Sequence, residues 1–334
     1  MSGSPMMDCN YPSILDDMLN SLLLVTGFVL LIYGANLLID GASSLAHRLK
    51  ISDIVIGLTI VAFGTSAPEL AVNVIASFRG SSSIVTGNVL GSNIFNIMVI
   101  LGITALFFPL EVKTNTTWIE IPFTILAALV VLVIAGDRMF APSAVNRISR
   151  EEGMICLFFF MIFMAYIAFT IKGGSYTGGI PKKVFSLARS VIMIIAGLLM
   201  LTFGGRFIVN SASEIARLLG VTERIISLTI VSVGTSLPEL AASVIAARKK
   251  NVDMAIGNIV GSNIFNVFLI LGVSAMVNPV TVPGGSQLDV LLNLLASLLL
   301  FLFIFTGRGR KIENWEGAIF LLIYGSYLYY LFFR

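Results

Sequence analysis

Two glutamates stand in near-identical short motifs within strongly apolar sequence. Glu69 lies in GTSAPEL, residues 64–70, and Glu239 lies in GTSLPEL, residues 234–240. A proline directly precedes each glutamate, so the helix loses a backbone donor and the preceding turn is distorted. An unpaired carbonyl in hydrocarbon costs several kcal/mol unless protein, water or an ion satisfies it. Each motif therefore predicts a helix break that gathers carbonyl, hydroxyl and carboxylate oxygens.

The oxygen atoms at each break suit a hard cation. Thr65 and Ser66 supply hydroxyls in the first motif, and Thr235 and Ser236 supply them in the second. Ca²⁺ prefers about 6–8 oxygen ligands. A charged side chain in the middle of a bilayer costs roughly 2.5–3.5 kcal/mol, so two carboxylates there require neutralisation. One divalent cation, two monovalent cations or protons would provide it, which predicts exchange of cations at one site.

A second repeated motif adds a polar stripe to a neighbouring helix. GNVLGSNIFN occupies residues 87–96, and GNIVGSNIFN occupies residues 257–266. Residues spaced by four positions share one helix face. The stripes consist of Asn88, Ser92 and Asn96 in the first copy and Asn258, Ser262 and Asn266 in the second. Two glycines in each copy permit close approach of another backbone, and we expect that neighbour to be the broken helix.

These motifs belong to one long internal repeat in a membrane protein. Residues 64–102 and 234–272 align without a gap, and 21 of the 39 aligned positions are identical. The chain is 57% hydrophobic and 12% charged, whereas soluble domains are roughly one quarter charged. Its apolar runs of about 20 residues predict an all-α polytopic membrane protein. A nucleic-acid partner and an enzymatic function are not expected.

The predicted fold has ten transmembrane helices arranged as two inverted five-helix repeats. The helices are expected at residues 20–46, 52–79, 83–108, 117–136, 151–171, 184–217, 222–248, 252–277, 288–306 and 314–333. Five helices per repeat is an odd number, so the second repeat enters the membrane from the opposite side. This inversion would bring the two broken helices together at an ion site near the membrane midplane.

The predicted organisation places both termini outside the cell membrane. It consists of an extracellular segment 1–19, a first repeat 20–171, a short cytoplasmic linker 172–183 and a second repeat 184–334. With this orientation, thirteen lysines and arginines fall on the inner side and seven on the outer side, as the positive-inside rule favours. The two cysteines indicate neither a disulfide framework nor a metal-ligand spacing. No cofactor and no obligatory protein partner beyond the lipid bilayer are expected.

With both motifs repeated, the sequence resembles the Ca²⁺/cation antiporter superfamily and within it the sodium/calcium exchanger family of the prokaryotic type. The resemblance implies a central Ca²⁺ site formed by Glu69 and Glu239 with the backbone carbonyls of Thr65 and Thr235. It further implies two flanking Na⁺ sites, one formed by the Ala62 carbonyl with Ser66 and Ser92 and the other by the Ser232 carbonyl with Ser236 and Ser262. Asn96 and Asn266 would complete the middle of the site.

The same resemblance implies secondary active exchange of Na⁺ for Ca²⁺ by alternating access, usually three Na⁺ for one Ca²⁺ and therefore electrogenic. One position departs from part of the family. K⁺-dependent exchangers and some prokaryotic relatives have aspartate where this chain has Asn266, so K⁺-independent transport is expected. The linker is also too short for a large Ca²⁺-sensing domain, and no cytosolic Ca²⁺ regulation is expected.

Three other functions are compatible with the same residues. Burial and a like charge both favour protonation of a carboxylate, so the glutamates could serve Ca²⁺/H⁺ exchange. A cation channel would use the same oxygen ligands, although inverted repeats with midplane carboxylates favour a carrier. A structural membrane scaffold would need neither glutamate for ion binding or flux.

Overall fold

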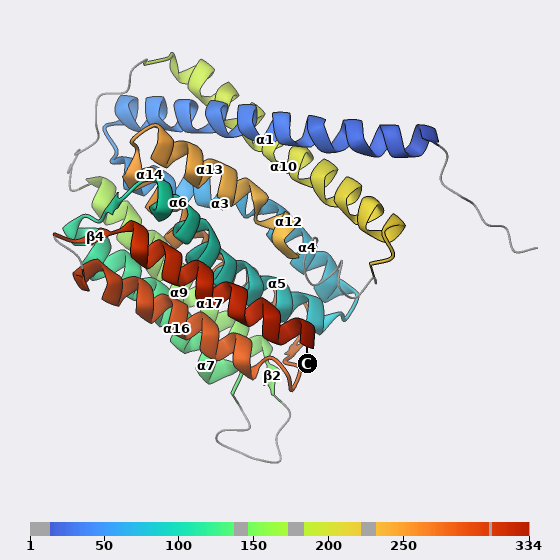
Figure 1. Cartoon of the computed structure of the whole chain (residues 1–334). Helices are drawn as coiled ribbons and strands as arrows, with labels where there is room; N and C mark the ends of the chain where they lie inside the picture. Colours follow the sequence, from blue (N-terminus) through green and yellow to red (C-terminus); the bar gives the residue numbers. More distant parts are fainter. Residues whose placement is uncertain (1–13, 137–145, 173–183, 222–231, 307–308, 334) are drawn as a thin grey trace, which may run out of the picture.

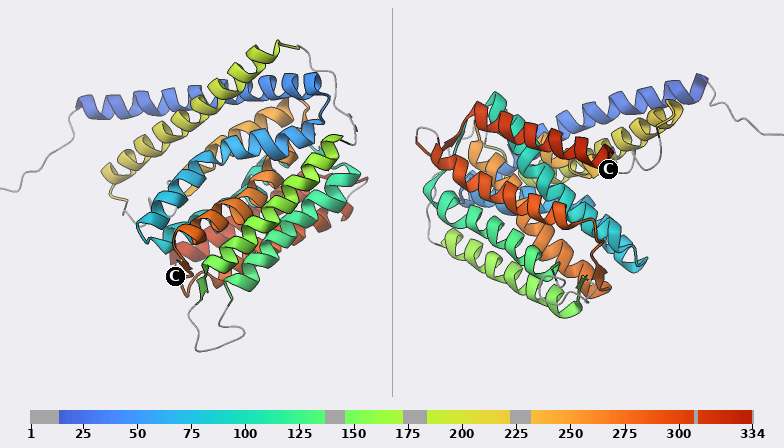
Figure 2. Two further views of the ribbon diagram at one scale, coloured as in Figure 1. Left: turned by 180° about the vertical axis from the view of Figure 1, so that it is seen from behind. Right: turned by 60° about the horizontal axis from the view of Figure 1, so that its bottom comes forward.

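The computed structural model describes residues 14–136, 146–172, 184–221, 232–306 and 309–333. Figure 1 shows a bundle of helices in which α1 and α10 lie together along one side. The start of α1 and the end of α17 lie at the same end of this bundle. Figure 2 shows the same arrangement from behind and from below.

The helices of the first half extend to α9. They are α1 (Ile14–Leu49), α2 (Asp53–Ile56), η1 (Gly57–Val61), α3 (Ala62–Thr65), α4 (Ala67–Phe78), α5 (Ser82–Phe95), η2 (Asn96–Leu101), α6 (Gly102–Phe107), η3 (Thr116–Glu120), α7 (Ile121–Ile134) and α9 (Arg150–Lys172). Those named η are π-helical turns within longer helices. α1 begins at Ile14 rather than at residue 20, because a helix can continue beyond its apolar segment into polar sequence.

The described helices of the second half follow the same order. They are α10 (Leu187–Leu218), α12 (Ser232–Thr235), α13 (Leu237–Arg248), α14 (Val252–Ile264), η5 (Phe265–Leu271), α15 (Gly272–Val277), α16 (Gln287–Thr306) and α17 (Asn314–Phe333). The start of the helix expected at 222–248 and nearly all of the linker expected at 172–183 lie outside the described residues.

Two short strand pairs tie loops of the two halves together. β1 (Leu110–Glu111) pairs antiparallel with β4 (Lys311–Ile312), and β2 (Arg147–Ile148) pairs antiparallel with β3 (Val280–Thr281). Figure 1 labels β4 and β2 at opposite ends of the bundle. Each end is therefore closed by one loop from each half.

The described residues contain seven helical segments that are long and apolar enough to cross a membrane. The bent pair 53–65 and 67–78 makes an eighth if it is one span. Seven or eight spans are fewer than the ten expected. They include neither the segment 232–248, whose preceding residues lie outside the described part of the chain, nor α17. The chain is an all-helical integral membrane protein.

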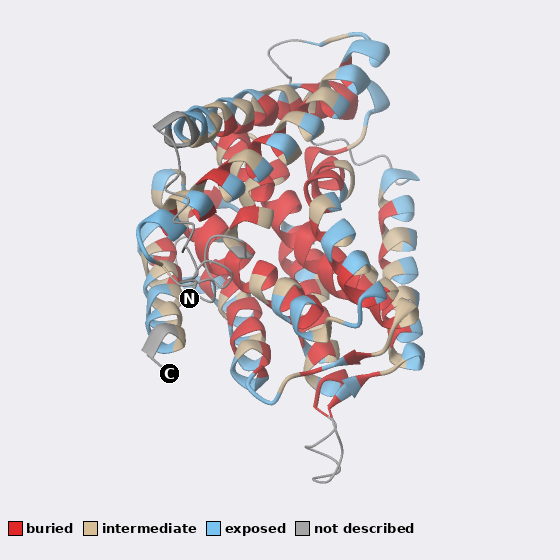
Figure 3. Cartoon of the chain, turned by 90° about the vertical axis from the view of Figure 1, so that its right-hand side faces the viewer, coloured by how far each residue is buried: buried red, intermediate tan, exposed pale blue. Residues whose placement is uncertain are grey.

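The core of the bundle consists of two spans, 82–107 and 252–277. In each, 83% of the most apolar 18-residue window is buried, against 17% in α9. Figure 3 shows this buried interior enclosed by helices with exposed outer faces. The repeated Asn/Ser stripes therefore occupy the two helices that are most completely surrounded by protein.

Candidate cation-binding site

Each GTSxPEL motif breaks a helix at its serine, as the sequence predicts. Ser66 separates α3 from α4, with φ −83° and ψ 3°, and the two parts of this helix are bent by 47°. Ser236 separates α12 from α13 with a similar conformation, φ −91° and ψ 7°. Glu69 and Glu239 then lie in the first turns of α4 and α13, where the helix dipole favours a negative charge.

The two glutamates face the opposite repeat in the buried centre. Each is 1% exposed. The Ser66 hydroxyl donates to Glu239 Oε1 at 2.9 Å, and the Ser236 hydroxyl lies 3.4 Å from Glu69 Oε1. The same serines contact the neighbouring stripes: Ser66 Oγ lies 3.1 Å from Ser262 Oγ, and Ser236 Oγ lies 3.2 Å from Ser92 Oγ. Each carboxylate is thus held by a hydroxyl of the other half.

Four oxygen atoms of the candidate site have no hydrogen-bond partner among the described residues. They are Oε2 of Glu69, Oε2 of Glu239, Oδ1 of Asn96 and Oδ1 of Asn266, and all four are buried. Buried polar atoms are normally satisfied, so this group of unpartnered acceptors requires an explanation. Two carboxylate oxygens and two amide oxygens form an acceptor set of the kind that a hard cation prefers.

Two further asparagines hold the amide groups of the site. Asn96 Nδ2 donates to Asn263 Oδ1 at 2.9 Å, and Asn266 Nδ2 donates to Asn93 Oδ1 at 3.0 Å. Asn93 and Asn263 also donate to each other's backbone carbonyls, both at 3.4 Å. Because the amide nitrogens of Asn96 and Asn266 are used in these bonds, their oxygens stay available.

A different set of contacts fixes the backbone next to each glutamate. Asn73 donates to the Glu69 carbonyl at 2.7 Å and to Asn88 Oδ1 at 2.8 Å. In the second half, Asn258 donates to the Glu239 carbonyl at 3.3 Å and to Ser243 Oγ at 2.9 Å. The sequence placed Asn88 and Asn258 on the polar stripes without giving them a ligand role. Asn73 and Ser243, which occupy equivalent positions in the repeat, were not among the predicted ligands.

The backbone carbonyls that were predicted as ligands belong to residues at the broken turns of the two helices. The Ala62 carbonyl already accepts a hydrogen bond from the Ser66 amide at 3.0 Å, and the Thr65 hydroxyl lies 3.3 Å from it. In the second half, the Ser236 amide bonds to the Val233 carbonyl at 3.1 Å. Ser232 begins α12.

The two threonines of the motifs differ in their surroundings. Thr65 is 1% exposed, and its hydroxyl contacts the Val61 carbonyl and Asn258 Oδ1, both at 3.1 Å. Thr235 is half-buried and also has a polar partner. The described hydrogen bonds do not single out the backbone oxygens of these two residues.

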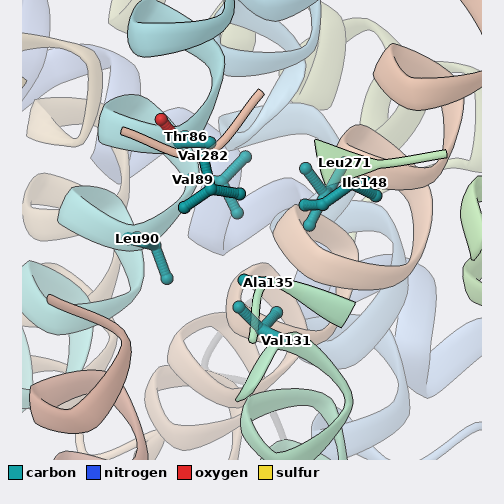
Figure 4. Close-up of a pocket in the computed structure, with 8 residues that line it drawn as sticks. All are labelled: Thr86, Val89, Leu90, Val131, Ala135, Ile148, Leu271 and Val282. Atoms are coloured by element: carbon teal, nitrogen blue, oxygen red, sulfur yellow. The ribbon is translucent and has the colours of Figure 1, made fainter. Parts of the chain in front are cut away.

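A small cavity nearby is unsuited to ions. It holds only about 10 Å³ and is lined almost entirely by aliphatic side chains, including Val89, Val131 and Leu271 (Figure 4). Such a volume accommodates at most one water molecule. The candidate cation ligands do not line it.

Comparison with known proteins gives one consistent result. The family described as "Sodium/calcium exchanger protein" matches residues 19–169 and 189–333. The chain is 36% identical over 322 residues to the "Putative antiporter CaxA" of Alkalimonas amylolytica, covering 93% of this chain and 98% of the relative. It is 32% identical over 353 residues to the "Sodium/calcium exchanger MaX1" of Methanosarcina acetivorans, covering 94% and 99%.

Solved structures show the same relation at the level of the fold. The sodium-calcium exchanger NCX_Mj, in crystals soaked with 10 mM Na⁺ and no Ca²⁺, superposes with a TM-score of 0.78 at 29% sequence identity. The match covers 93% of this chain and 98% of the solved one. The similarity therefore extends over both halves and is not restricted to the repeated motifs.

Proposed function

We infer that this chain, which belongs to the sodium/calcium exchanger protein family and is a transporter rather than an enzyme, exchanges Na⁺ for Ca²⁺ across the cell membrane by alternating access. The observation that carries this proposal is the group of four buried, unpartnered oxygens on Glu69, Glu239, Asn96 and Asn266. Their two carboxylates match the charge of one Ca²⁺ or of two Na⁺. Competition for the same oxygens would couple the two ions.

We propose roles for the other predicted ligands from their relation to the two central carboxylates. We assign the hydroxyls of Ser66, Ser92, Ser236 and Ser262 to flanking Na⁺ sites. Ser66 and Ser236 each contact a central carboxylate, and each also contacts the serine of a neighbouring stripe, Ser262 or Ser92, which supports this assignment. The carbonyls of Ala62, Thr65, Ser232 and Thr235 would complete the coordination after a local rearrangement.

We also propose the complete architecture of ten membrane helices in two inverted repeats. The reciprocal bonds between Asn93 and Asn263, whose positions differ by 170 residues, support a two-fold relation between the halves. The crossed strand pairs β1–β4 and β2–β3 support it as well. The segment 232–248 and α17 would supply the two spans beyond the eight.

The proposed orientation places both termini outside. Three salt bridges hold lysines of the loops expected to be cytoplasmic: Lys113 with Asp253 at 2.5 Å, Lys249 with Asp40 at 2.7 Å, and Lys311 with Glu111 at 2.5 Å. Their partners come from both halves. These three lysines belong to loops on the proposed cytoplasmic side, where the positive-inside rule favours basic residues.

The proposed exchange is electrogenic and independent of K⁺. Three Na⁺ for one Ca²⁺ moves one net charge, and a membrane potential would contribute about 2.3 kcal/mol per 100 mV for that charge. The two strong carboxylates of the centre, with an amide at Asn266, leave no third negative charge for a co-transported K⁺. Stimulation of transport by K⁺ would contradict this part of the proposal.

The decisive experiment is Ca²⁺ uptake into proteoliposomes under an outward Na⁺ gradient, without K⁺ and without a pH gradient. Wild type should accumulate Ca²⁺, and Glu239→Gln should abolish accumulation because one of two central charges is lost. Asp289→Asn serves as the matched control, since Asp289 is a carboxylate of α16 that contacts Tyr327 instead of the site. Uptake driven only by a pH gradient would indicate Ca²⁺/H⁺ exchange at the same glutamates.

A further inference from the structure

A cavity of about 660 Å³ lies at the end of the bundle where β1 and β4 pair. It is formed where the start of α2, the loop after β1, η3, the end of α9 and the turn before β4 meet. The described residues that line it include none of the predicted cation ligands. This cavity is therefore separate from the candidate cation site, and its lining must be considered independently.

Two cationic side chains, those of Lys113 and Arg310, line this cavity. The ammonium group of Lys113 pairs with Asp253 at 2.5 Å, and this side chain remains 39% exposed. Arg310 is exposed and donates to the Thr114 hydroxyl through Nη1. A guanidinium carries five N–H donors, so Arg310 can donate to a further acceptor that enters the cavity.

The other exposed polar groups of the lining are also hydrogen-bond donors. The Thr114 hydroxyl accepts from Arg310, so its own proton can be donated elsewhere, and the amide of the adjacent Asn115 is exposed. Glu120, the one carboxylate of the described lining, accepts from the Tyr166 hydroxyl through Oε1, and its Oε2 is buried. Several donors around a guanidinium suit an anion with several oxygens, such as a phosphate group.

Two exposed tryptophans mark the level of the membrane surface at this end of the bundle. Trp118 in η3 is 57% exposed, and Trp315 in the first turn of α17 is 47% exposed. Tryptophan is enriched where a membrane protein meets the lipid headgroups. Phe169, next to the lining residue Thr170, is 74% exposed and offers apolar surface beside the cavity. The cavity therefore lies at the depth of lipid phosphates, next to a surface on which an acyl chain can pack.

We propose that this cavity binds the phosphate group of an anionic phospholipid. Arg310 is the main charged ligand, Thr114 and Asn115 are neutral donors, and Lys113 adds positive charge. Basic pockets between membrane helices on the cytoplasmic side bind anionic headgroups, and the proposed orientation places β1 and β4 on that side. The site goes beyond the proposed exchange, because neither transported cation binds there.

Native mass spectrometry of the purified full-length protein tests the proposal, with dioleoylphosphatidylglycerol and dioleoylphosphatidylcholine as the probes. Delipidated wild type in detergent should retain one phosphatidylglycerol per chain at concentrations at which it retains no phosphatidylcholine. Arg310→Gln should weaken phosphatidylglycerol binding about tenfold, because a hydrogen bond to a charged group is lost. Arg189→Gln is the matched control and should bind as wild type does, since Arg189 is an exposed arginine that lies over the Phe185 ring.

A second variant keeps the test informative if Arg310→Gln does not fold. Asn115→Asp changes an exposed residue and adds a negative charge to the lining, so we expect roughly fivefold weaker phosphatidylglycerol binding. Equal retention of the two lipids, unchanged affinity in both variants, or an equal loss in Arg189→Gln would each overturn the proposal. Displacement by equimolar inorganic phosphate would overturn it too, because the site would then take a free anion. Failure of Na⁺-driven Ca²⁺ uptake in wild type would contradict the proposed exchange and leave this binding result standing.

Discussion

The two halves of the candidate site carry the same glycine pair, but only the second pair is packed tightly in the described structure. A Cβ on Gly257 would lie 2.7 Å from the Ile54 carbonyl oxygen. A Cβ on Gly261 would lie 2.8 Å from the Ala62 Cβ. These glycines therefore allow α14 to cross the first broken helix in direct backbone contact.

The corresponding glycines of α5 have no counterpart of these contacts among the described residues. A Cβ on Gly87 or Gly91 would meet no described atom within 4 Å. Asn88 beside them is half-buried, whereas Asn258 in the second half is 1% exposed. The segment that would pack here by repeat symmetry belongs to residues 222–231, outside the description.

This difference teaches that a repeated motif specifies its own residues but not the segment that packs against them. Gly257 and Gly261 meet α2, η1 and α3, whereas the neighbours that repeat symmetry assigns to Gly87 and Gly91 belong to the segment around residues 222–231. An identical glycine pair therefore acts on packing only through the helix that crosses it.

The difference between the two glycine pairs should have its largest effect on stability when Gly261 and the equivalent Gly91 are each replaced by alanine. Gly261→Ala would force its Cβ against Ala62 and the Leu58 backbone, and overpacking of this kind costs about 1–3 kcal/mol. Gly91→Ala meets no described atom within 4 Å, so a cost as large as that of Gly261→Ala would have to come from residues 222–231. Thermal unfolding in detergent measures both variants, and equal destabilisation would show that the first half is packed as tightly as the second.

The sequence predicted the family and much of the helix pattern. The family resemblance is confirmed by the match over both halves. The expected helices 252–277 and 314–333 coincide with 252–277 of α14–α15 and with α17, and 52–79 corresponds to the bent segment 53–78. These predictions succeeded because apolar length, proline position and repeat spacing are local properties that the bilayer makes decisive.

Contacts across the repeat interface could not be predicted in the same way. The motif specified Asn96 and Asn266, but the bonds that orient them come from Asn263 and Asn93 of the opposite half. The bond from the Tyr166 hydroxyl to Glu120 Oε1 likewise joins two helices that are distant in the sequence. Such features follow from how helices cross, which one sequence alone does not determine.

A smaller effect is expected from the asparagines that hold the site amides. Asn263→Ala removes the acceptor of Asn96 Nδ2, so the Asn96 oxygen loses its fixed direction. The loss of one buried hydrogen bond, about 1–2 kcal/mol, corresponds to roughly tenfold weaker Ca²⁺ binding. Asn93→Ala should weaken it equally through Asn266. Calorimetric titration with Ca²⁺ measures both, and a marked inequality would locate the asymmetry at the centre itself.

The smallest difference is expected between Ser66→Ala and Ser236→Ala. Ser66 Oγ lies 2.9 Å from Glu239 Oε1, whereas Ser236 Oγ lies 3.4 Å from Glu69 Oε1, and hydrogen bonds weaken as they lengthen beyond about 3.0 Å. Ser66→Ala should therefore weaken Na⁺ binding more, by about threefold relative to Ser236→Ala, which corresponds to roughly 0.7 kcal/mol. Na⁺ titration of each variant, with Glu69 and Glu239 unchanged, gives the ratio of the two Na⁺ affinities. A reversed order would mean that the Ser236 hydroxyl moves closer to Glu69 when the site is occupied, so that the two halves become alike only around the bound ion.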